Sequence, residues 1–191
     1  MSENRVPLFP LSAHILPGGR MALRIFEPRY TRMVKEACAN DSGFVICMLN
    51  AKGDKERNEH IHKVGTYCKV IDFDKLEDGL LGVTVEGLHL VEISNVETEH
   101  DGLRTGQCAT FGAWQCTDTC VSEPLIVTRL QEIFERYPEL KELYTSPKFN
   151  DPTWVVHRWL ELVPVSAEYK QELLSERNCN EAVNFLTNLI E

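Results

Sequence analysis

The sequence predicts an α+β protein in which a strand-rich N-terminal part precedes an all-helical C-terminal part. Apolar residues in the first part form short runs with a period near two, which is typical of strands. From residue 122 onward the apolar residues recur with the 3.6-residue period of amphipathic helices. We therefore expect two domains, a β-rich one over residues 1–121 and a helical one over residues 122–191.

The expected strands are apolar runs bounded by turn residues. They cover residues 44–48, 61–73, 80–85, 88–96 and 103–111. Gly65 lies inside the second run and indicates a bulge or a close contact at that point. Glu86 and Gly87 separate the third run from the fourth, which predicts either a hairpin or a bulge there.

One strong helical pattern interrupts these strands. It begins at Pro28, a residue type favoured in the first turn of a helix, and runs to Ala39. Four more helices are expected in the C-terminal part, each preceded by a residue whose side chain can cap the helix. These capping residues are Ser122, Asp151, Ser166 and Asn178. Residues 137–151 contain several turn-forming residues and are expected to form a loop.

The charge balance argues against nucleic acid as a partner. The 191 residues carry a net charge of −9, and no basic run is longer than two residues. Binding to a phosphate backbone depends on lysine and arginine side chains that neutralise the phosphates. We therefore expect no nucleic acid partner.

The N-terminus and the cysteines indicate a cytoplasmic protein. Prolines interrupt the first apolar residues, so the pattern of a signal peptide is missing. No apolar stretch approaches the roughly 18 residues that a membrane span requires. The seven cysteines are an odd number in a chain long enough to fold without disulfides. We expect reduced, mostly buried thiols, a cytoplasmic location and no membrane partner.

Residues 6–37 form the densest motif in the chain. Three spaced prolines lead into a Gly-Gly pair, and the tetrad Glu27-Pro28-Arg29-Tyr30 follows the next apolar run. This stretch resembles the opening signature of the Lon protease N-terminal domain family, the substrate-binding LON domain, and the likeness extends over the whole chain. The positions that carry the resemblance are Pro7, Pro10, Pro17, Glu27, Pro28, Arg29, Tyr30, Gly65 and Gly87.

The resemblance implies a PUA-like pseudo-β-barrel closed around one helix, followed by a helical subdomain. It also implies a module that binds protein or peptide segments, such as unfolded substrates, without transforming them. The family usually has an Arg-Phe pair just after the second glycine, where this chain has Leu88-His89-Leu90.

Motifs for ATP hydrolysis and for two common types of nucleophile are missing. The 191 residues contain no G-x-x-x-x-G-K-[ST] sequence to hold a triphosphate. They also contain no S-x-x-K or G-x-S-x-G nucleophile pattern. We therefore expect a freestanding domain that is not an enzyme and uses no cofactor.

Arg29 can be interpreted in two ways. Its guanidinium could bind a substrate carboxylate through two parallel hydrogen bonds. Alternatively, Glu27 and Pro28 begin the helix at its positive end, Arg29 ties strand ends together and Tyr30 fills the core. We favour the structural interpretation for the signature residues, so the partner-binding residues stay unidentified. Core packing is also expected for the three tryptophans, Trp114, Trp154 and Trp159.

The cysteines and histidines give little support to a metal site. Cys116 and Cys120 are spaced like a pair of zinc ligands, and His60 and His62 could join Cys68. However, no second pair at a recognisable spacing supplies the remaining ligands. Unpaired cysteines more often pack as small buried hydrophobes, so we expect no bound metal.

Two other classes of function stay open as alternatives to a protein-binding module. A small hydrolase that depends on cysteine and histidine would need both residues within hydrogen-bond reach inside a cleft. An RNA-binding protein on a PUA-like fold would need a concentrated basic face.

Overall fold

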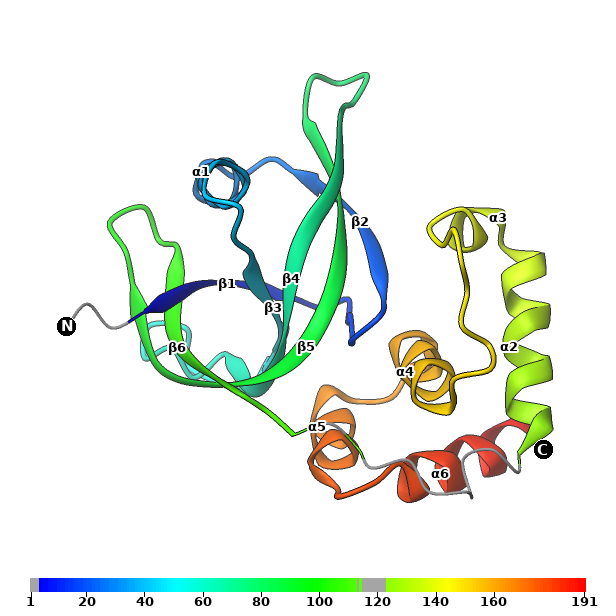
Figure 1. Cartoon of the computed structure of the whole chain (residues 1–191). Coiled ribbons are helices and arrows are strands. Elements are labelled where there is room, and N and C mark those ends of the chain that lie inside the picture. Colours follow the sequence, from blue (N-terminus) through cyan, green and yellow to red (C-terminus); the bar gives the residue numbers. More distant parts are fainter. Residues whose placement is uncertain (1–3, 113, 115–122) are drawn as a thin grey trace. The chain divides into compact units, whose positions relative to one another are not determined.

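The computed structural model describes residues 4–112, 114 and 123–191. The chain divides into two compact units, Met1–Phe111 and Gly112–Glu191 (Figure 1). The predicted domain boundary at residue 121 lies outside the described residues and stays a prediction. None of the described helices is long and apolar enough to cross a membrane.

The N-terminal unit is a mixed six-stranded sheet with one helix. Its strands are β1 (Arg5–Leu11), β2 (Arg20–Ile25), β3 (Phe44–Leu49), β4 (Ile61–Lys75), β5 (Leu81–Thr98) and β6 (Arg104–Thr110). They are joined in the order β2-β5-β4-β3-β1-β6, and β5 also pairs with β6. β1 and β3 run parallel, whereas the other paired strands run antiparallel. Figure 1 shows β4 and β5 continuing past β2 as a long hairpin.

The length of β5 decides how the sheet is connected. Its N-terminal part pairs with β2, and its C-terminal part pairs with β6. The register with β4 shifts between Gly87 and His89, so a bulge lies there within one continuous strand. A Cβ atom on Gly87 would lie only 2.6 Å from the carbonyl oxygen of Leu16. The bulge interpretation of Glu86-Gly87 is therefore confirmed, and the hairpin interpretation is wrong.

Helix α1 (Pro28–Ala39) covers one face of this sheet. Its buried residues are Met33, Val34 and Ala37. They pack in a core cluster with strand residues such as Phe9, Phe44 and Val85. Lys35 and Glu36 on the opposite side of the helix are exposed.

The α+β class predicted from the sequence is confirmed, with a difference in how the sheet and the helix are arranged. In the pairings of the described residues, β5, β4, β3, β1 and β6 are linked in a ring because β5 pairs with both β4 and β6. β2 is joined to β5 alone, so the six strands do not form one closed barrel. Because one side of α1 faces solvent, the helix lies on the sheet rather than inside it.

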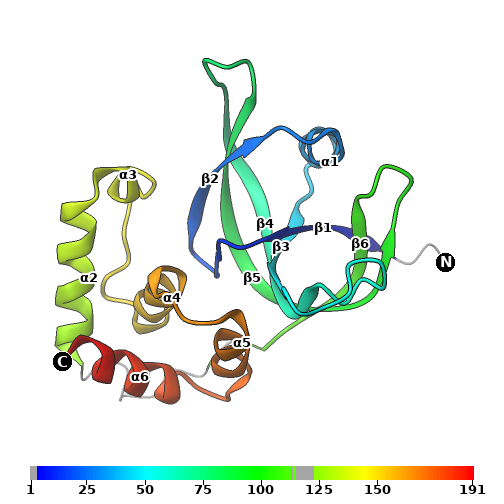
Figure 2. The same cartoon turned by 180° about the vertical axis from the view of Figure 1, so that it is seen from behind.

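The part of the C-terminal unit that the structure describes is helical (Figure 2). Its helices are α2 (Pro124–Arg136), α3 (Pro138–Lys141), α4 (Pro152–Leu162), α5 (Ala167–Ser175) and α6 (Asn180–Ile190). The short α3 lies where the sequence predicted a loop. All three tryptophans are buried, which confirms their predicted place in the core. The indole N–H of Trp159 donates to the carbonyl oxygen of Ile126 at 2.9 Å, so burial leaves this polar group bonded.

The predicted helix caps are partly observed. Asp151 and Ser166 accept hydrogen bonds from backbone N–H groups in the first turns of α4 and α5, as predicted. Ser122 lies outside the described residues. Helix α6 begins at Asn180 with Cys179 at its cap position, one residue later than predicted. The predicted capping residue Asn178 nevertheless accepts a hydrogen bond through its side-chain oxygen from the Asn180 N–H at 3.0 Å.

Candidate functional site

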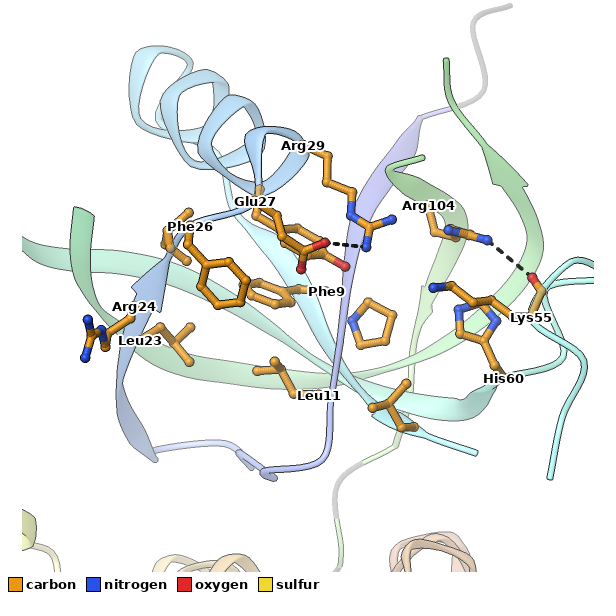
Figure 3. A pocket seen from close by; sticks show the side chains of 14 residues that line it. Phe9, Leu11, Leu23, Arg24, Phe26, Glu27, Arg29, Lys55, His60 and Arg104 are labelled. Atoms are coloured by element: carbon orange, nitrogen blue, oxygen red, sulfur yellow. Dashed lines mark hydrogen bonds and ion pairs between the residues drawn. The ribbon is translucent and has the colours of Figure 1, made fainter. Parts of the chain in front are cut away.

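A cavity of about 270 Å³ lies in the N-terminal unit (Figure 3). β1, β2, the start of α1, the loop after β3 and the first residue of β6 contribute its lining. One side, the apolar wall, consists of Phe9, Leu11, Leu23, Phe26 and Tyr30. The other side, the basic wall, consists of Arg29, Lys55, His60 and Arg104. The cavity therefore combines apolar surface with positive charge.

The apolar wall contains a fixed aromatic pair and a freely accessible ring. The rings of Phe9 and Tyr30 are stacked with their centroids 4.1 Å apart. Phe26 follows directly after β2, and 69% of its surface is exposed. An exposed aromatic side chain beside a cavity is a typical anchor for a binding partner.

The basic wall depends on a shared hydrogen-bond acceptor in the turn between β5 and β6. The carbonyl oxygen of Gly102 accepts hydrogen bonds from Arg29 Nη1 at 3.2 Å and from Arg104 Nη1 at 2.9 Å. The two guanidinium groups are therefore held close together. Arg29 also forms an ion pair with Glu27, whose Oε1 lies 2.7 Å from Arg29 Nη2. Arg104 donates instead to neutral oxygens, namely Asn58 Oδ1 and the carbonyl oxygen of Lys55.

His60 completes the basic wall. Its side chain is only 8% exposed, and its Nδ1 atom has no hydrogen-bond partner among the described residues. Burial lowers the pKa of His60, and the nearby charges of Arg104, Lys55 and Arg29 lower it further. The free site therefore favours the neutral imidazole and has a positive potential.

The position of Arg29 is compatible with both interpretations considered from the sequence. It ties the start of α1 to the β5–β6 turn, and the same guanidinium lines the cavity. Glu27 and Tyr30 lie beside it in the lining. The structural assignment of the signature residues stays a prediction, and these contacts are compatible with a part in binding.

The other signature residues lie at tight backbone positions. Pro17 and Gly18 form the centre of a turn in which the Gly19 N–H donates to the Leu16 carbonyl at 2.9 Å. Gly18 has a φ of 81°, a conformation that favours glycine. Gly65 is constrained by a close contact instead, because a Cβ atom there would lie 2.6 Å from a Val45 methyl carbon. Pro7 and Pro10 lie in β1, and Pro10 reaches the cavity.

The metal candidates from the sequence do not come together in the part of the chain that the structure describes. The one group of three suitable side chains found there is Glu99, His100 and Asp101, and it does not include His60, His62 or Cys68. Arg32 already binds both carboxylates of this group. Cys116 and Cys120 lie outside the described residues.

The described thiols give no support to cysteine catalysis. None of them lines the cavity. Burial raises the pKa of Cys108 to about 11 and raises that of Cys47 as well, so neither is a ready thiolate. Cys38, Cys47, Cys68 and Cys108 are not disulfide-bonded. Cys179 is buried and disulfide-bonded, so the expectation of reduced thiols is wrong for this residue.

Sequence reasoning did not single out several residues of the cavity as site residues, among them Phe26, Lys55 and Arg104. Lys55 and Arg104 belong to no motif, and each looks like an ordinary surface residue in the sequence. Phe26 carried one usable signal, because it is a large aromatic residue directly before the signature tetrad. Arg104 could be found only from the pairing of β1 with β6, which places it opposite Leu8. Lys55 could be found only from the folded contact in which its carbonyl oxygen accepts a hydrogen bond from Arg104.

Solved structures identify the fold as that of Lon N-terminal domains. A Lon N-terminal domain protein from Xanthomonas campestris superimposes with a TM-score of 0.70 at 23% identity, covering 98% of this chain and 99% of that one. The N-terminal domain of the Mycobacterium avium complex Lon protease gives a TM-score of 0.70 at 14% identity, covering 97% of each chain.

The family follows from the sequence match. The family model of the ATP-dependent protease La (LON) substrate-binding domain matches residues 5–191, and the chain belongs to this family. A Lon protease from Bacillus thuringiensis (strain Al Hakam) is 23% identical over the whole of this chain. A Lon protease from Xanthomonas oryzae pv. oryzae is 26% identical over 97% of it. The chain spans about a quarter of the length of these curated relatives.

Proposed function

We propose that this chain binds an exposed segment of another protein and does not transform it. The observation that carries the proposal is Phe26, a largely exposed aromatic residue at the edge of a cavity with an apolar wall. Membership of a substrate-binding domain family supports the same function. An unfolded or extended segment exposes apolar side chains that such a cavity can take up.

A non-catalytic role is part of this proposal. The residues that line the cavity include no cysteine, serine or aspartate. Its one carboxylate, Glu27, is held in an ion pair by Arg29. This composition offers no activated nucleophile, which supports binding over hydrolysis.

We also propose that nucleic acid is not the partner and that the protein acts in the cytoplasm. The net charge of −9 opposes binding to a phosphate backbone. Four described cysteines that form no disulfide support a reducing compartment, whereas the disulfide of Cys179 opposes it.

A binding assay with an unfolded probe tests the main proposal. A reduced, carbamidomethylated protein serves as the probe, and the same protein in its folded form serves as the negative control. We expect Phe26→Ala to weaken binding of the unfolded probe by at least about tenfold, as for a central aromatic contact. Leu189→Ala is the matched control, because it removes a 51% exposed apolar residue from α6. Equal binding of the folded and unfolded probes would contradict the proposal.

A further inference from the structure

We propose that the basic wall of the cavity binds a carboxylate of the captured protein segment. The site would then select segments that carry an apolar or aromatic residue next to an acidic group. The acidic group is either an Asp or Glu side chain or the C-terminal carboxylate of the segment. This inference rests on the proposed function and names its substrate class.

The first argument is the way in which the two arginines are held. Their guanidinium groups share one carbonyl oxygen, that of Gly102, although like charges at short distance repel each other. Glu27 balances the charge of Arg29. Arg104 has no carboxylate partner among the described residues, and its acceptors are neutral oxygens. A guanidinium that is held in place by neutral acceptors keeps its full positive charge and is suited to bind an anion.

The second argument is the unused hydrogen-bonding capacity of the same wall. His60 is buried, and its Nδ1 atom is unpartnered within the described chain. Buried polar atoms are nearly always hydrogen-bonded, so an unpartnered one in a cavity lining indicates a missing partner. Figure 3 shows the His60 ring beside Lys55 and Arg104 at one end of the cavity. Lys55 forms no ion pair in the described part of the chain.

The third argument is the contrast between the cavity and the whole chain. The chain has a net charge of −9, yet the lining contains Arg29, Lys55 and Arg104 against the single acid Glu27. The remaining basic lining residue, Arg24, is paired with Asp78. A local excess of positive charge in an acidic protein is typical of a site for an anion.

The neighbouring apolar wall favours a peptide over a nucleic acid as the source of the anion. A peptide presents an apolar side chain and a carboxylate within one or two residues, which matches the two walls. Nucleic acid would bring phosphates at regular intervals along its backbone and would need basic residues spread over a longer surface. Elsewhere in the same unit, the exposed residues Asp72 and Asp74 on β4 would repel it.

Fluorescence anisotropy with labelled 12-residue peptides tests the inference. The peptides contain a central Phe followed by Asp or Asn, and each is made with a free or an amidated C-terminus. We expect the peptides that carry the recognised carboxylate to bind at least about tenfold more tightly than the neutral ones. Dependence on Asp identifies a side-chain carboxylate, and dependence on the free C-terminus identifies the chain end.

Variants of the basic wall give the second readout. Lys55→Gln and Arg104→Gln should lower the ratio of binding between the carboxylate peptides and the neutral peptides toward one. Arg129→Gln is the matched control, since this arginine forms an i,i+3 ion pair with Glu132 on α2 and should keep the preference. Lys55→Gln guards against a folding defect, because Lys55 is an exposed residue of the loop after β3.

Three results would overturn the inference. Equal binding of all four peptides would refute carboxylate recognition and leave the proposed function intact. Binding of none of the peptides, together with none of the unfolded probe, would refute both proposals. A single-stranded 12-nucleotide RNA that displaces a bound peptide from the wild-type protein, but not from Lys55→Gln, would reassign the basic wall to nucleic acid.

Discussion

Gly102 connects the backbone of the β5–β6 turn to the basic wall of the cavity. Its φ of 91° lies in the left-handed region, where residues with a Cβ atom are strained. Its N–H donates to the carbonyl oxygen of Glu99 at 2.9 Å and closes the turn. Its carbonyl oxygen is the shared acceptor for Arg29 and Arg104. A Cβ atom at this position would lie 3.0 Å from Arg29 Nη1, so this guanidinium would have to shift by a few tenths of an ångström.

Replacing Gly102 tests this connection at the scale of one residue. We expect Gly102→Ala to lower the free energy of unfolding by about 1 kcal/mol because of its left-handed conformation. It should also weaken binding of the carboxylate peptide, because Arg29 is displaced. Gly79→Ala is the control, since Gly79 has a φ of 83° but no atom near its Cβ position. Urea denaturation and peptide anisotropy measure the two effects, and equal peptide binding by both variants would show that Gly102 does not position Arg29.

Helix α1 is fixed to the β5–β6 turn by a second cluster of charges. Arg32 on the helix donates to Asp101 at 2.8 Å and to Glu99 at 2.5 Å. It also forms an i,i+4 ion pair with Glu36 in the same helix. Hydrogen bonding to Arg32 lowers the pKa of Asp101 to about 2, and the Leu103 N–H contributes to this shift. The cluster therefore ties two elements of the sheet unit together through a pH-dependent contact.

The low pKa of Asp101 predicts a specific acid sensitivity. A carboxyl group whose pKa falls on folding stabilises the protein above its ordinary pKa of 3.8, and this contribution is lost as the pH falls toward 2. We expect the wild-type protein to be more stable than Asp101→Asn at pH 7, with the difference shrinking between pH 4 and pH 2. Urea midpoints of both proteins at pH 7, 4 and 2.5 measure it. A difference that stays constant with pH would refute a native Arg32–Asp101 contact.

The sequence pattern did not show that β5 is one continuous strand. Glu86-Gly87 has the composition of a turn, so two strands and a single strand with a bulge were both compatible with the sequence. Gly87 is required for close contact with the Leu16–Gly19 turn, and its N–H donates to the Gly19 carbonyl at 2.9 Å. This contact forms only in the folded sheet. Gly87 therefore indicated where the strand is irregular, but it did not indicate whether the irregularity is a hairpin or a bulge.

At the scale of the whole molecule, the net charge of the chain is negative, whereas most charged side chains in the cavity lining are positive. The net charge of −9 repels an acidic peptide at long range, whereas the basic wall attracts it at contact. Salt screens exposed charges beyond a Debye length of about 8 Å at physiological ionic strength. Long-range repulsion and short-range attraction should therefore affect different rate constants.

The salt dependence of peptide binding tests this charge arrangement. Between 50 and 500 mM NaCl, we expect the association rate constant for the Asp-containing peptide to rise because the overall repulsion is screened. The dissociation rate constant should rise too, because the contact with the basic wall weakens. Stopped-flow anisotropy measures both, and the neutral peptide is the control. An association rate constant that falls steeply with salt would contradict the predicted repulsion.

The sequence by itself determined the fold class, the limits of α1, most helix positions and the family. These features depend on local periodicity, on proline and capping residues, and on the signature from Pro7 to Tyr30. The cavity was decided by the tertiary structure alone. Arg29, Lys55 and Arg104 lie far apart in the chain. The two arginines meet because β6 pairs with β1 and because both bind the carbonyl oxygen of Gly102, and Arg104 also binds the carbonyl oxygen of Lys55. Non-local pairing of this kind leaves no local pattern. Arg29 belongs to the signature, but Lys55 and Arg104 look like ordinary surface cations until the sheet folds.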